Sequence, residues 1–301
     1  MKTHKLLQMS ILIACYSVVS AQDYAFKVLA NKGNNEIKSG DTWQPLKTGA
    51  SLKSGDEVKL SDNAYIGLVH NSGKPVELKE AGVHKVSALE GKVSTGTSVL
   101  NKYTDFILSS NSAEAKKNRL NATGAVHRGP IPGVTAPIIV YLPEKENSGI
   151  FNKTAIIRWD AGSLAGPYVV TLKNMFEDIL IKQETPETSF VVDLAVEKFA
   201  SENAILIEVS SKSDPSQVSK QHLIKKLSPA ELEKVAAAIK DLRSEVSEET
   251  AMNKLFLAGF YEQNNLLIDA IAAYEDAVRL EPEVPTFRES YDEFLIRNHL
   301  K

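Results

Sequence analysis

The hydrophobic pattern of this chain changes its period at Ser228. Before this residue, short apolar runs alternate with turn-forming residues, as in strands; after it, apolar residues recur every three or four positions, as on one face of a helix. The tetrapeptide Ser228-Pro229-Ala230-Glu231 can cap a helix, start its first turn and complete a capping box. A change of period at one point predicts separate β and α regions, and 301 residues suffice for about two or three domains.

The first β region is predicted to be an all-β domain over residues 22–108. Short apolar runs at 25–29, 57–60 and 64–69 are separated by turn sequences such as 31–35. The dense pattern of apolar residues and glycines from 43 to 60, followed by 64–68 and the turn at 71–73, resembles the FecR-like β-domain of bacterial envelope proteins. That resemblance implies a signalling or structural module that is not itself an enzyme. The same residues also suit any small β-barrel or β-roll.

A linker at 109–136 and a second β-domain at 137–226 follow. Apolar periodicity disappears in the linker, which ends in the stiff sequence 129–133. Roughly seven strands in about 90 residues suggest a β-sandwich, with apolar runs at 138–141, 154–159, 168–172, 189–194, 204–209 and 222–225. The arrangement resembles fibronectin type III or related immunoglobulin-like modules, although it lacks the cysteine pair of true immunoglobulin domains. Trp43 and Trp159 are interpreted as core anchors of the two β-domains rather than as platforms for sugars.

The region from 228 to 301 is predicted to be helical, with four helices. The first begins at Ser228, two more span about 251–263 and 266–280 around a turn at 264–265, and the last spans about 286–298. The first helix has its apolar residues at helical spacing (Leu232, Val235, Ala236, Ile239 and Leu242). The last helix has one stripe of apolar residues (Phe287, Tyr291, Phe294 and Leu295).

The middle helix pair resembles a single tetratricopeptide repeat. The pattern consists of Leu257-Ala258, Tyr261, Ala270, Tyr274, Ala277 and Pro282. In that family the small residues let two helices approach closely, the aromatic residues fill the space between helices, and the proline ends the second helix. Lys254 stands where the family usually has a bulky apolar residue. Because solenoids usually need about three repeats, one unit is expected to form a compact tetratricopeptide-like bundle, whose surface either is simply packed or docks another envelope protein.

The N-terminus is predicted to be a secretory signal peptide over residues 1–21. Lys2 and Lys5 precede an apolar stretch from 6 to 19, and the small residues before Gln22 suit cleavage. A second interpretation takes 12–15 as a lipobox, with Cys15 as a lipid anchor. We therefore expect a bacterial protein that is exported, periplasmic or associated with the cell surface. Cys15 is the only cysteine, and no other apolar run approaches the roughly 18 residues of a membrane span.

The sequence predicts no catalytic, cofactor-binding or metal-binding residues, and no cofactor. The six histidines form no metal-type pair, the acidic pairs lie in polar segments, and no serine has the setting of a nucleophile. The net charge of −3 does not suggest a nucleic-acid partner. The protein is therefore expected not to be an enzyme.

Two function hypotheses follow. The first is a non-catalytic exported envelope protein that mediates protein–protein interaction or assembly through its helical C-terminal domain, with the β-domains as spacers or docking modules; its partner is then another envelope protein. The alternative is a protein that binds or acts on polysaccharide or peptidoglycan in a cleft between the two β-domains, an analogy at the level of the fold.

Overall fold

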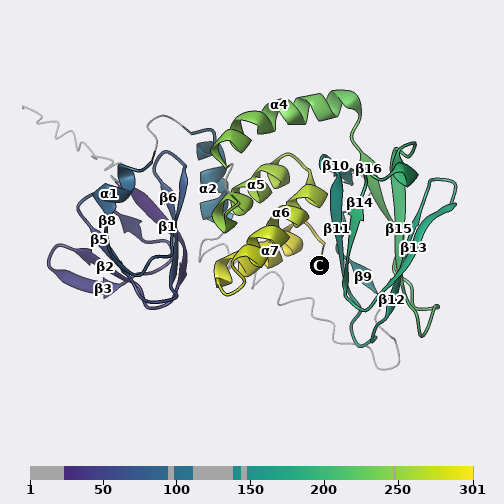
Figure 1. Ribbon diagram of the computed structural model, residues 1–301, viewed down its shortest axis with the longest axis horizontal. Coiled ribbons are helices and arrows are strands. Elements are labelled where there is room, and N and C mark those ends of the chain that lie inside the picture. The colour runs from purple at the N-terminus through teal and green to yellow at the C-terminus, as the bar shows by residue number, and fades with distance from the viewer. Residues whose placement is uncertain (1–23, 94–97, 111–137, 144–147, 247–248, 301) are drawn as a thin grey trace, which may run out of the picture.

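The computed structural model describes residues 24–93, 98–110, 138–143, 148–246 and 249–300. The signal peptide at 1–21, the anchor candidate Cys15 and the linker from 111 onwards lie outside these residues. Four β-sheets and a helical region form a multidomain β plus α architecture. The helices lie between the two β-domains, which occupy opposite ends of the molecule (Figure 1).

The N-terminal β-domain consists of two four-stranded sheets rather than a closed barrel. One sheet has the order β4-β1-β6-β7 (Ser51–Leu52, Phe26–Lys32, Tyr65–His70 and Pro75–Leu78). The other has the order β3-β2-β5-β8 (Thr42–Pro45, Glu36–Ser39, Glu57–Leu60 and Gly82–Lys85). Neighbouring strands are antiparallel. Alternate residues such as Phe26 and Val28 on β1 and Val58 and Leu60 on β5 form one core between the sheets.

Two helices follow these strands in a stretch for which we predicted only strands. They are α1 (Val86–Glu90) and α2 (Asn101–Ser110). Tyr103 and Ile107 are buried and lie four residues apart, which places them on one face of α2. That face packs on α5 of the helical region, where the rings of Tyr103 and Phe260 lie 5.7 Å apart. Tyr103, Phe106 and Ile107 have the i, i+3, i+4 spacing of one helix face. A ten-residue helix is marginal by itself, however, and depends on this long-range packing.

The second β-domain is a sandwich of a five-stranded and a three-stranded sheet. The five-stranded sheet has the order β10-β16-β15-β12-β13 (Gly149–Ile150, His222–Lys226, Ala204–Ser211, Tyr168–Lys173 and Ile179–Thr185). The three-stranded sheet has the order β14-β11-β9 (Ser189–Asp193, Thr154–Asp160 and Ile139–Val140). A short 3₁₀ helix spans Glu197–Phe199. Only the short pairing of β10 with β16 is parallel among these strands.

The sequence prediction missed β10 and β13. β13 lies at the edge of its sheet, and its apolar run is limited to its first three residues, because its second half is polar. Trp159 is 2% exposed and meets Tyr168 edge-on at 5.6 Å, which confirms it as a core anchor. Trp43 is not one: it is half-buried on the second N-terminal sheet, with the ammonium groups of Lys38 and Lys59 about 6 Å from its ring.

The helical region has the four helices that the sequence predicts. They are α4 (Pro229–Glu245), α5 (Ala251–Gln263), α6 (Leu267–Leu280) and α7 (Pro285–Arg297). The capping box at the start of α4 is present: the Ser228 hydroxyl accepts the N–H of Glu231, whose carboxylate accepts the N–H of Ser228. Asn265, in the turn between α5 and α6, has a φ of +58°. Asparagine tolerates this left-handed conformation better than most residues.

The helix pair α5–α6 is closely packed. Ala258, Ala270 and Ala277 have no exposed surface, as expected for residues that let two helices approach. The aromatic stripe of α7 is also part of the core: the ring centroid of Tyr274 on α6 lies 5.9 Å from that of Tyr291 and 4.8 Å from that of Phe294. The apolar stripe on the last helix is therefore used inside the protein.

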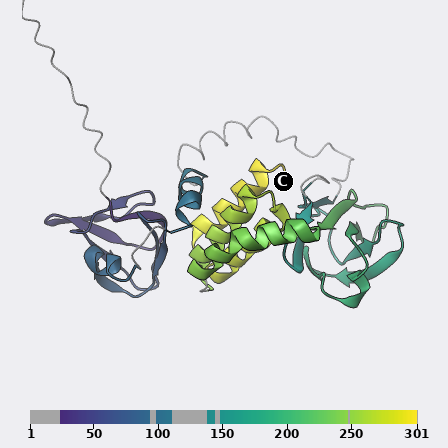
Figure 2. The same ribbon diagram turned by 90° about the horizontal axis from the view of Figure 1, so that it is seen from above.

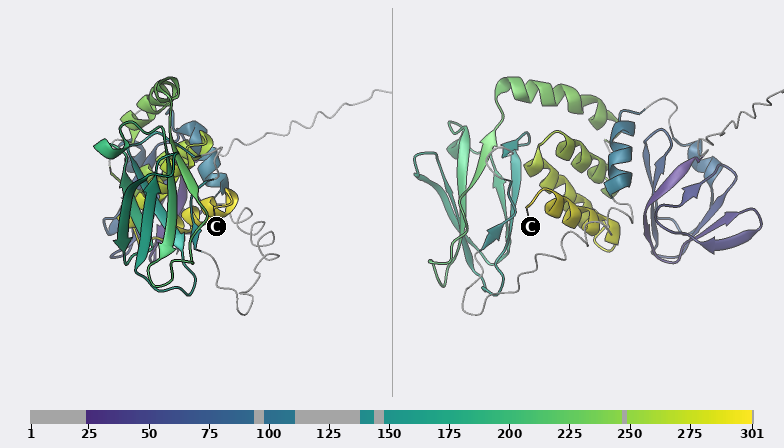
Figure 3. Two further views of the ribbon diagram at one scale, coloured as in Figure 1. Left: turned by 90° about the vertical axis from the view of Figure 1, so that its right-hand side faces the viewer. Right: turned by 180° about the vertical axis from the view of Figure 1, so that it is seen from behind.

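Both β-domains contact the helices directly. On the N-terminal side, α7 packs against β1 and α5 packs against β7. On the sandwich side, α6 packs against β10 and β11. Views from above and from behind show the same order, with α4 extending over the other helices from the sandwich (Figures 2 and 3). Only Ile239 and Leu242 of α4 are buried; Leu232, which we expected to face a core, is 38% exposed.

Candidate functional site

The sandwich is fixed to the helices by a buried carboxylate. Asp269, in the first turn of α6, has no exposed surface, and its two oxygens accept the backbone N–H groups of Phe151 and Asn152, each at 2.8 Å. Burial raises the pKa of Asp269 to about 6, and the two backbone hydrogen bonds oppose this rise. The carboxylate thereby holds the turn before β11 against the start of α6.

A second polar contact crosses the same junction. Arg158 of β11 donates from Nη2 to Oε2 of Glu275 on α6 at 2.7 Å, and the two side chains form an ion pair. The Glu275 side chain is 9% exposed and that of Arg158 is 35% exposed. The pair therefore combines one directional hydrogen bond with an ion pair between largely buried groups.

Arg243 of α4 approaches this junction from the other side. Asn152 Nδ2 donates to the Tyr261 hydroxyl of α5 at 3.1 Å, and Arg243 Nη2 lies 3.3 Å from Asn152 Oδ1 and 3.4 Å from the Tyr261 oxygen. The guanidinium also lies over the Phe151 ring, 5.7 Å from its centroid. Within the part of the chain that the structure describes, Arg243 forms no ion pair with a carboxylate.

Lys254 contributes the second cation of the site. Its ammonium group lies 2.7 Å from Glu249 and 3.2 Å from Asp276, and its side chain is 15% exposed. Burial lowers the pKa of Lys254 and its two carboxylate partners raise it, with a net shift upward. This explains the departure from the tetratricopeptide pattern at Lys254, because a cation paired across α5 and α6 takes the place of an apolar residue.

These groups line a cavity of about 330 Å³ between α4, α5, α6 and the turn before β11. Its apolar surface consists of Val246, Leu257, Ala272 and Ala273. Its polar wall contains two cations, three carboxylates and two neutral groups (Arg243, Lys254, Glu249, Asp269, Asp276, Asn152 and Tyr261). The volume lies at the small end of the range of about 300–1,000 Å³ that is usual for ligand pockets. Because Arg243 and Glu249 are exposed, the cavity can be reached from solvent.

The charges in this cavity are not equally available. Lys254 is paired with two carboxylates, and both Asp269 oxygens are occupied by backbone donors. Among the described residues, the side-chain hydrogen bonds of Arg243 are two long contacts to neutral oxygens, so N–H donors of its guanidinium remain for a further acceptor. The arrangement can therefore bind a carboxylate or another small anion beside an apolar surface.

No protein-family model matches this chain, and no curated protein matches it. The sequence predicted no site residue, and it therefore missed Arg243, Asn152 and Asp269. Of these three, only Asp269 stands out in the sequence, because it is a charged residue within the otherwise apolar run at 266–271.

Other predicted features lie apart from the cavity. His70, His84 and His222 lie on the separate strands β6, β8 and β16. Over the described ranges, no group of three or more histidine, cysteine or acidic side chains could hold a metal ion. In the same ranges, every helix is too short or too polar to cross a bilayer.

Proposed function

We propose that this protein is a non-catalytic exported envelope protein that binds another envelope protein, and that an acidic segment of this partner enters the cavity beside α4. The observation that carries the proposal is the Arg243 guanidinium at the cavity wall, which has no carboxylate partner among the described residues. An acidic side chain could accept from Arg243 while its chain packs on Ala272 and Ala273.

The packing of the helix pair supports this choice of surface. Gly259 of α5 is covered by α2: a Cβ there would lie 3.2 Å from Ile107 Cγ1. α7 and α6 are occupied by the N-terminal domain and the sandwich, respectively. The side of the helix pair that faces α4 therefore has the space that the other sides lack. In this proposal the β-domains are supports that hold the helices from both ends.

A photo-crosslinking experiment with a matched pair of variants tests the proposal. A photoreactive residue at Ala272, inside the cavity, should form a discrete adduct with a second protein in envelope extracts, and the same residue at the exposed Ala237 should not. Arg243→Ala should abolish the adduct, whereas Lys240→Ala, which removes a cation from α4 outside the cavity, should leave it unchanged. An adduct that persists in Arg243→Ala contradicts the proposal.

The polysaccharide or peptidoglycan alternative needs a different location from the one first expected. Helices lie between the two β-domains (Figure 1), so a ligand of this kind would use the same cavity rather than a cleft between these domains. Arg243 could equally pair with a carboxylate of a peptidoglycan peptide. Sedimentation with insoluble peptidoglycan distinguishes the two: binding that Arg243→Ala removes favours the alternative.

Export is part of the proposal and has its own test. Mass analysis of the protein from its source should show a mature N-terminus at Gln22; a chain that begins with acylated Cys15 would instead identify a lipoprotein. The FecR-like, immunoglobulin-like and tetratricopeptide-like relationships are likewise proposed. They are supported by the paired N-terminal sheets, the sandwich and the buried alanines of α5–α6.

A further inference from the structure

The turn between β12 and β13 displays apolar side chains at the surface of the sandwich. Phe176 is 85% exposed, and Met175 and Ile179 beside it are 55% and 58% exposed. We refer to these three residues as the apolar tip. β13 is the edge strand opposite β10, the strand of the same sheet that contacts α6. It lies on the side of the sandwich away from the helices (Figure 1), so the apolar tip is at the far edge of the sheet from the cavity.

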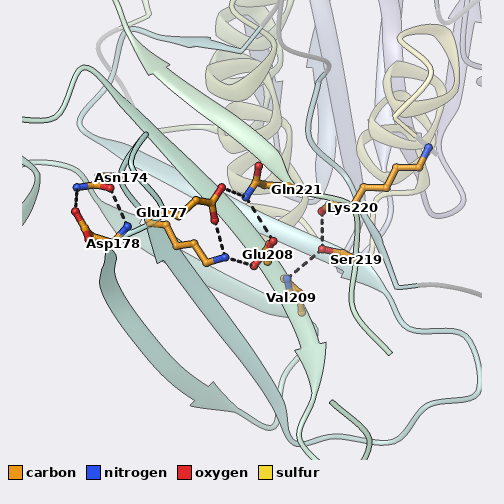
Figure 4. Close-up of polar contacts among 9 residues, drawn as sticks. Asn174, Glu177, Asp178, Glu208, Val209, Ser219, Lys220 and Gln221 are labelled. Atoms are coloured by element: carbon orange, nitrogen blue, oxygen red, sulfur yellow. Dashed lines mark hydrogen bonds and ion pairs between the residues drawn. The ribbon is translucent and has the colours of Figure 1, made fainter. Parts of the chain in front are cut away.

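The turn that carries the apolar tip is held firmly by its own side chains. Asn174 Oδ1 accepts the backbone N–H groups of Phe176 and Asp178, both at 2.9 Å, and Asn174 Nδ2 donates to Asp178 Oδ2 at 3.0 Å. Asn174 and Asp178 face each other across the turn (Figure 4). Phe176 is therefore exposed by a defined backbone conformation and not by a loose loop.

Neighbouring strands brace the same turn. Glu177 has a φ of +68°, a left-handed conformation that is uncommon for its residue type. Its carboxylate is held by Lys173 at 2.9 Å and by Gln221 at 3.0 Å, and Lys173 also pairs with Glu208 of β15 at 2.9 Å (Figure 4). Three segments of the chain thus stabilise a turn whose most exposed residue is a phenylalanine.

The charges around the apolar tip indicate which surface it fits. Glu177 and Glu208 share Lys173 as their ion-pair partner, and Asp178 is held by Asn174, so the carboxylates of this contact network outnumber its cation. A bilayer with anionic lipids attracts basic protein surfaces and repels acidic ones. An apolar pocket of a protein, rimmed by lysine or arginine, has complementary charge and suits an aromatic anchor.

We propose that the apolar tip is a docking site for a partner protein that has an apolar pocket with a basic rim. Phe176 fills the pocket, and the acidic groups of the turn face the basic rim. This surface is separate from the cavity, so it binds its partner whether or not Arg243 has the role proposed above.

The test uses the whole chain with a photoreactive residue at Met175 in envelope extracts. We expect one discrete adduct with a second protein, for which Phe176→Ser requires about 30-fold more chain to reach half of the maximal yield. The matched control Val83→Ser changes another exposed apolar residue, on β8 of the N-terminal domain, and should leave the yield unchanged. Arg243→Ala should also leave it unchanged, which separates this proposal from the function of the cavity.

Four further measurements complete the test. The peptide of the partner that carries the crosslink should be apolar with nearby lysine or arginine, and the yield should fall as salt is raised. An adduct with a second copy of this chain, or one insensitive to Phe176→Ser, overturns the proposal. So does co-sedimentation with phosphatidylglycerol vesicles that Phe176→Ser abolishes, because the surface would then bind lipid. Phe176→Ser should unfold at the same urea concentration as the parent, and a loss of stability would show that Phe176 packs within the protein.

Discussion

The helices hold the two β-domains by different kinds of contact. On the N-terminal side apolar groups meet closely: Tyr65 meets Phe287 edge-on with ring centroids 5.9 Å apart, and a Cβ on Gly67 would lie 2.7 Å from Met252 Sδ. Polar contacts surround this packing, such as the Met252 N–H that donates to Glu77 Oε1 at 2.8 Å. On the sandwich side the contact is polar, through the Asp269 carboxylate, and a cavity lies beside it.

The difference shows how one helical region serves two purposes. Apolar packing gains free energy from buried area and leaves no room beside it. Hydrogen bonds and ion pairs fix the orientation of the sandwich through a few directional contacts, so the surrounding space need not be filled. The polar junction is therefore where a binding site can exist without weakening the core.

The largest effect is expected at the apolar junction. Phe287→Ala removes a ring with no exposed surface and should cost about 3–5 kcal/mol in the free energy of unfolding. Because this ring meets the N-terminal domain, the two β-domains should also lose their coupling. Urea unfolding followed by tryptophan fluorescence tests this. In a chain that also carries Trp43→Phe, the fluorescence comes from Trp159 and reports the sandwich alone. In Phe287→Ala this transition should separate from the loss of N-terminal structure.

Asp269→Ala should weaken the polar junction by about 2–4 kcal/mol, because two buried backbone N–H groups lose their acceptor. The comparison variant is Asp276→Ala, which removes a partly exposed carboxylate of the same helix and should cost less than about 1 kcal/mol. Equal losses in the two variants, measured by urea unfolding, would show that the buried carboxylate does not hold the sandwich.

The pH dependence of stability should identify the same carboxylate. The folded-state pKa of Asp269, raised to about 6, lies above the ordinary value of 3.8, so the folded protein binds the proton more tightly than the unfolded chain. This contribution to stability is full below pH 3.8 and is lost as pH rises through about 6. Relative to Asp269→Asn, which cannot titrate, the parent should therefore lose stability over this window. A difference in unfolding free energy between the parent and Asp269→Asn that stays constant with pH would contradict this prediction.

The smallest effect is expected at the rim of the apolar junction. Lys79 pairs with Glu281 at 2.5 Å and with Glu77 at 3.1 Å, but its side chain is 53% exposed. Lys79→Met should change the free energy of unfolding by less than about 1 kcal/mol, since water screens such pairs. A larger loss would mean that the N-terminal junction also depends on charge, and the contrast between the two junctions would then weaken.

The parts of the fold that sequence predicted are those with local causes. The capping box at Ser228 fixed the start of α4, and the boundaries of the next three helices agree with the structure to within one residue. The spacing of Ala258, Ala270 and Ala277 indicated a tight helix pair because such packing depends on residue size.

The parts that sequence missed depend on distant partners. α2 is a ten-residue helix that depends on packing against α5, and β13 is an edge strand whose apolar residues are limited to its first three positions. Arg243 becomes a cavity residue only because α4 brings it to the turn at Phe151 and Asn152. No local pattern encodes that approach, which is set by the arrangement of whole domains.

The position of the helices between the β-domains has a consequence for how the molecule is made. The residues that join the two β-domains come last in the chain among those described, so both β-domains can form before anything fixes their mutual orientation. The apolar face of α2 stays uncovered until α5, about 150 residues later in the chain, has formed. The final shape is thus reached in one late step, and a chain that stops before α5 would lack the contacts that hold the two β-domains in one arrangement.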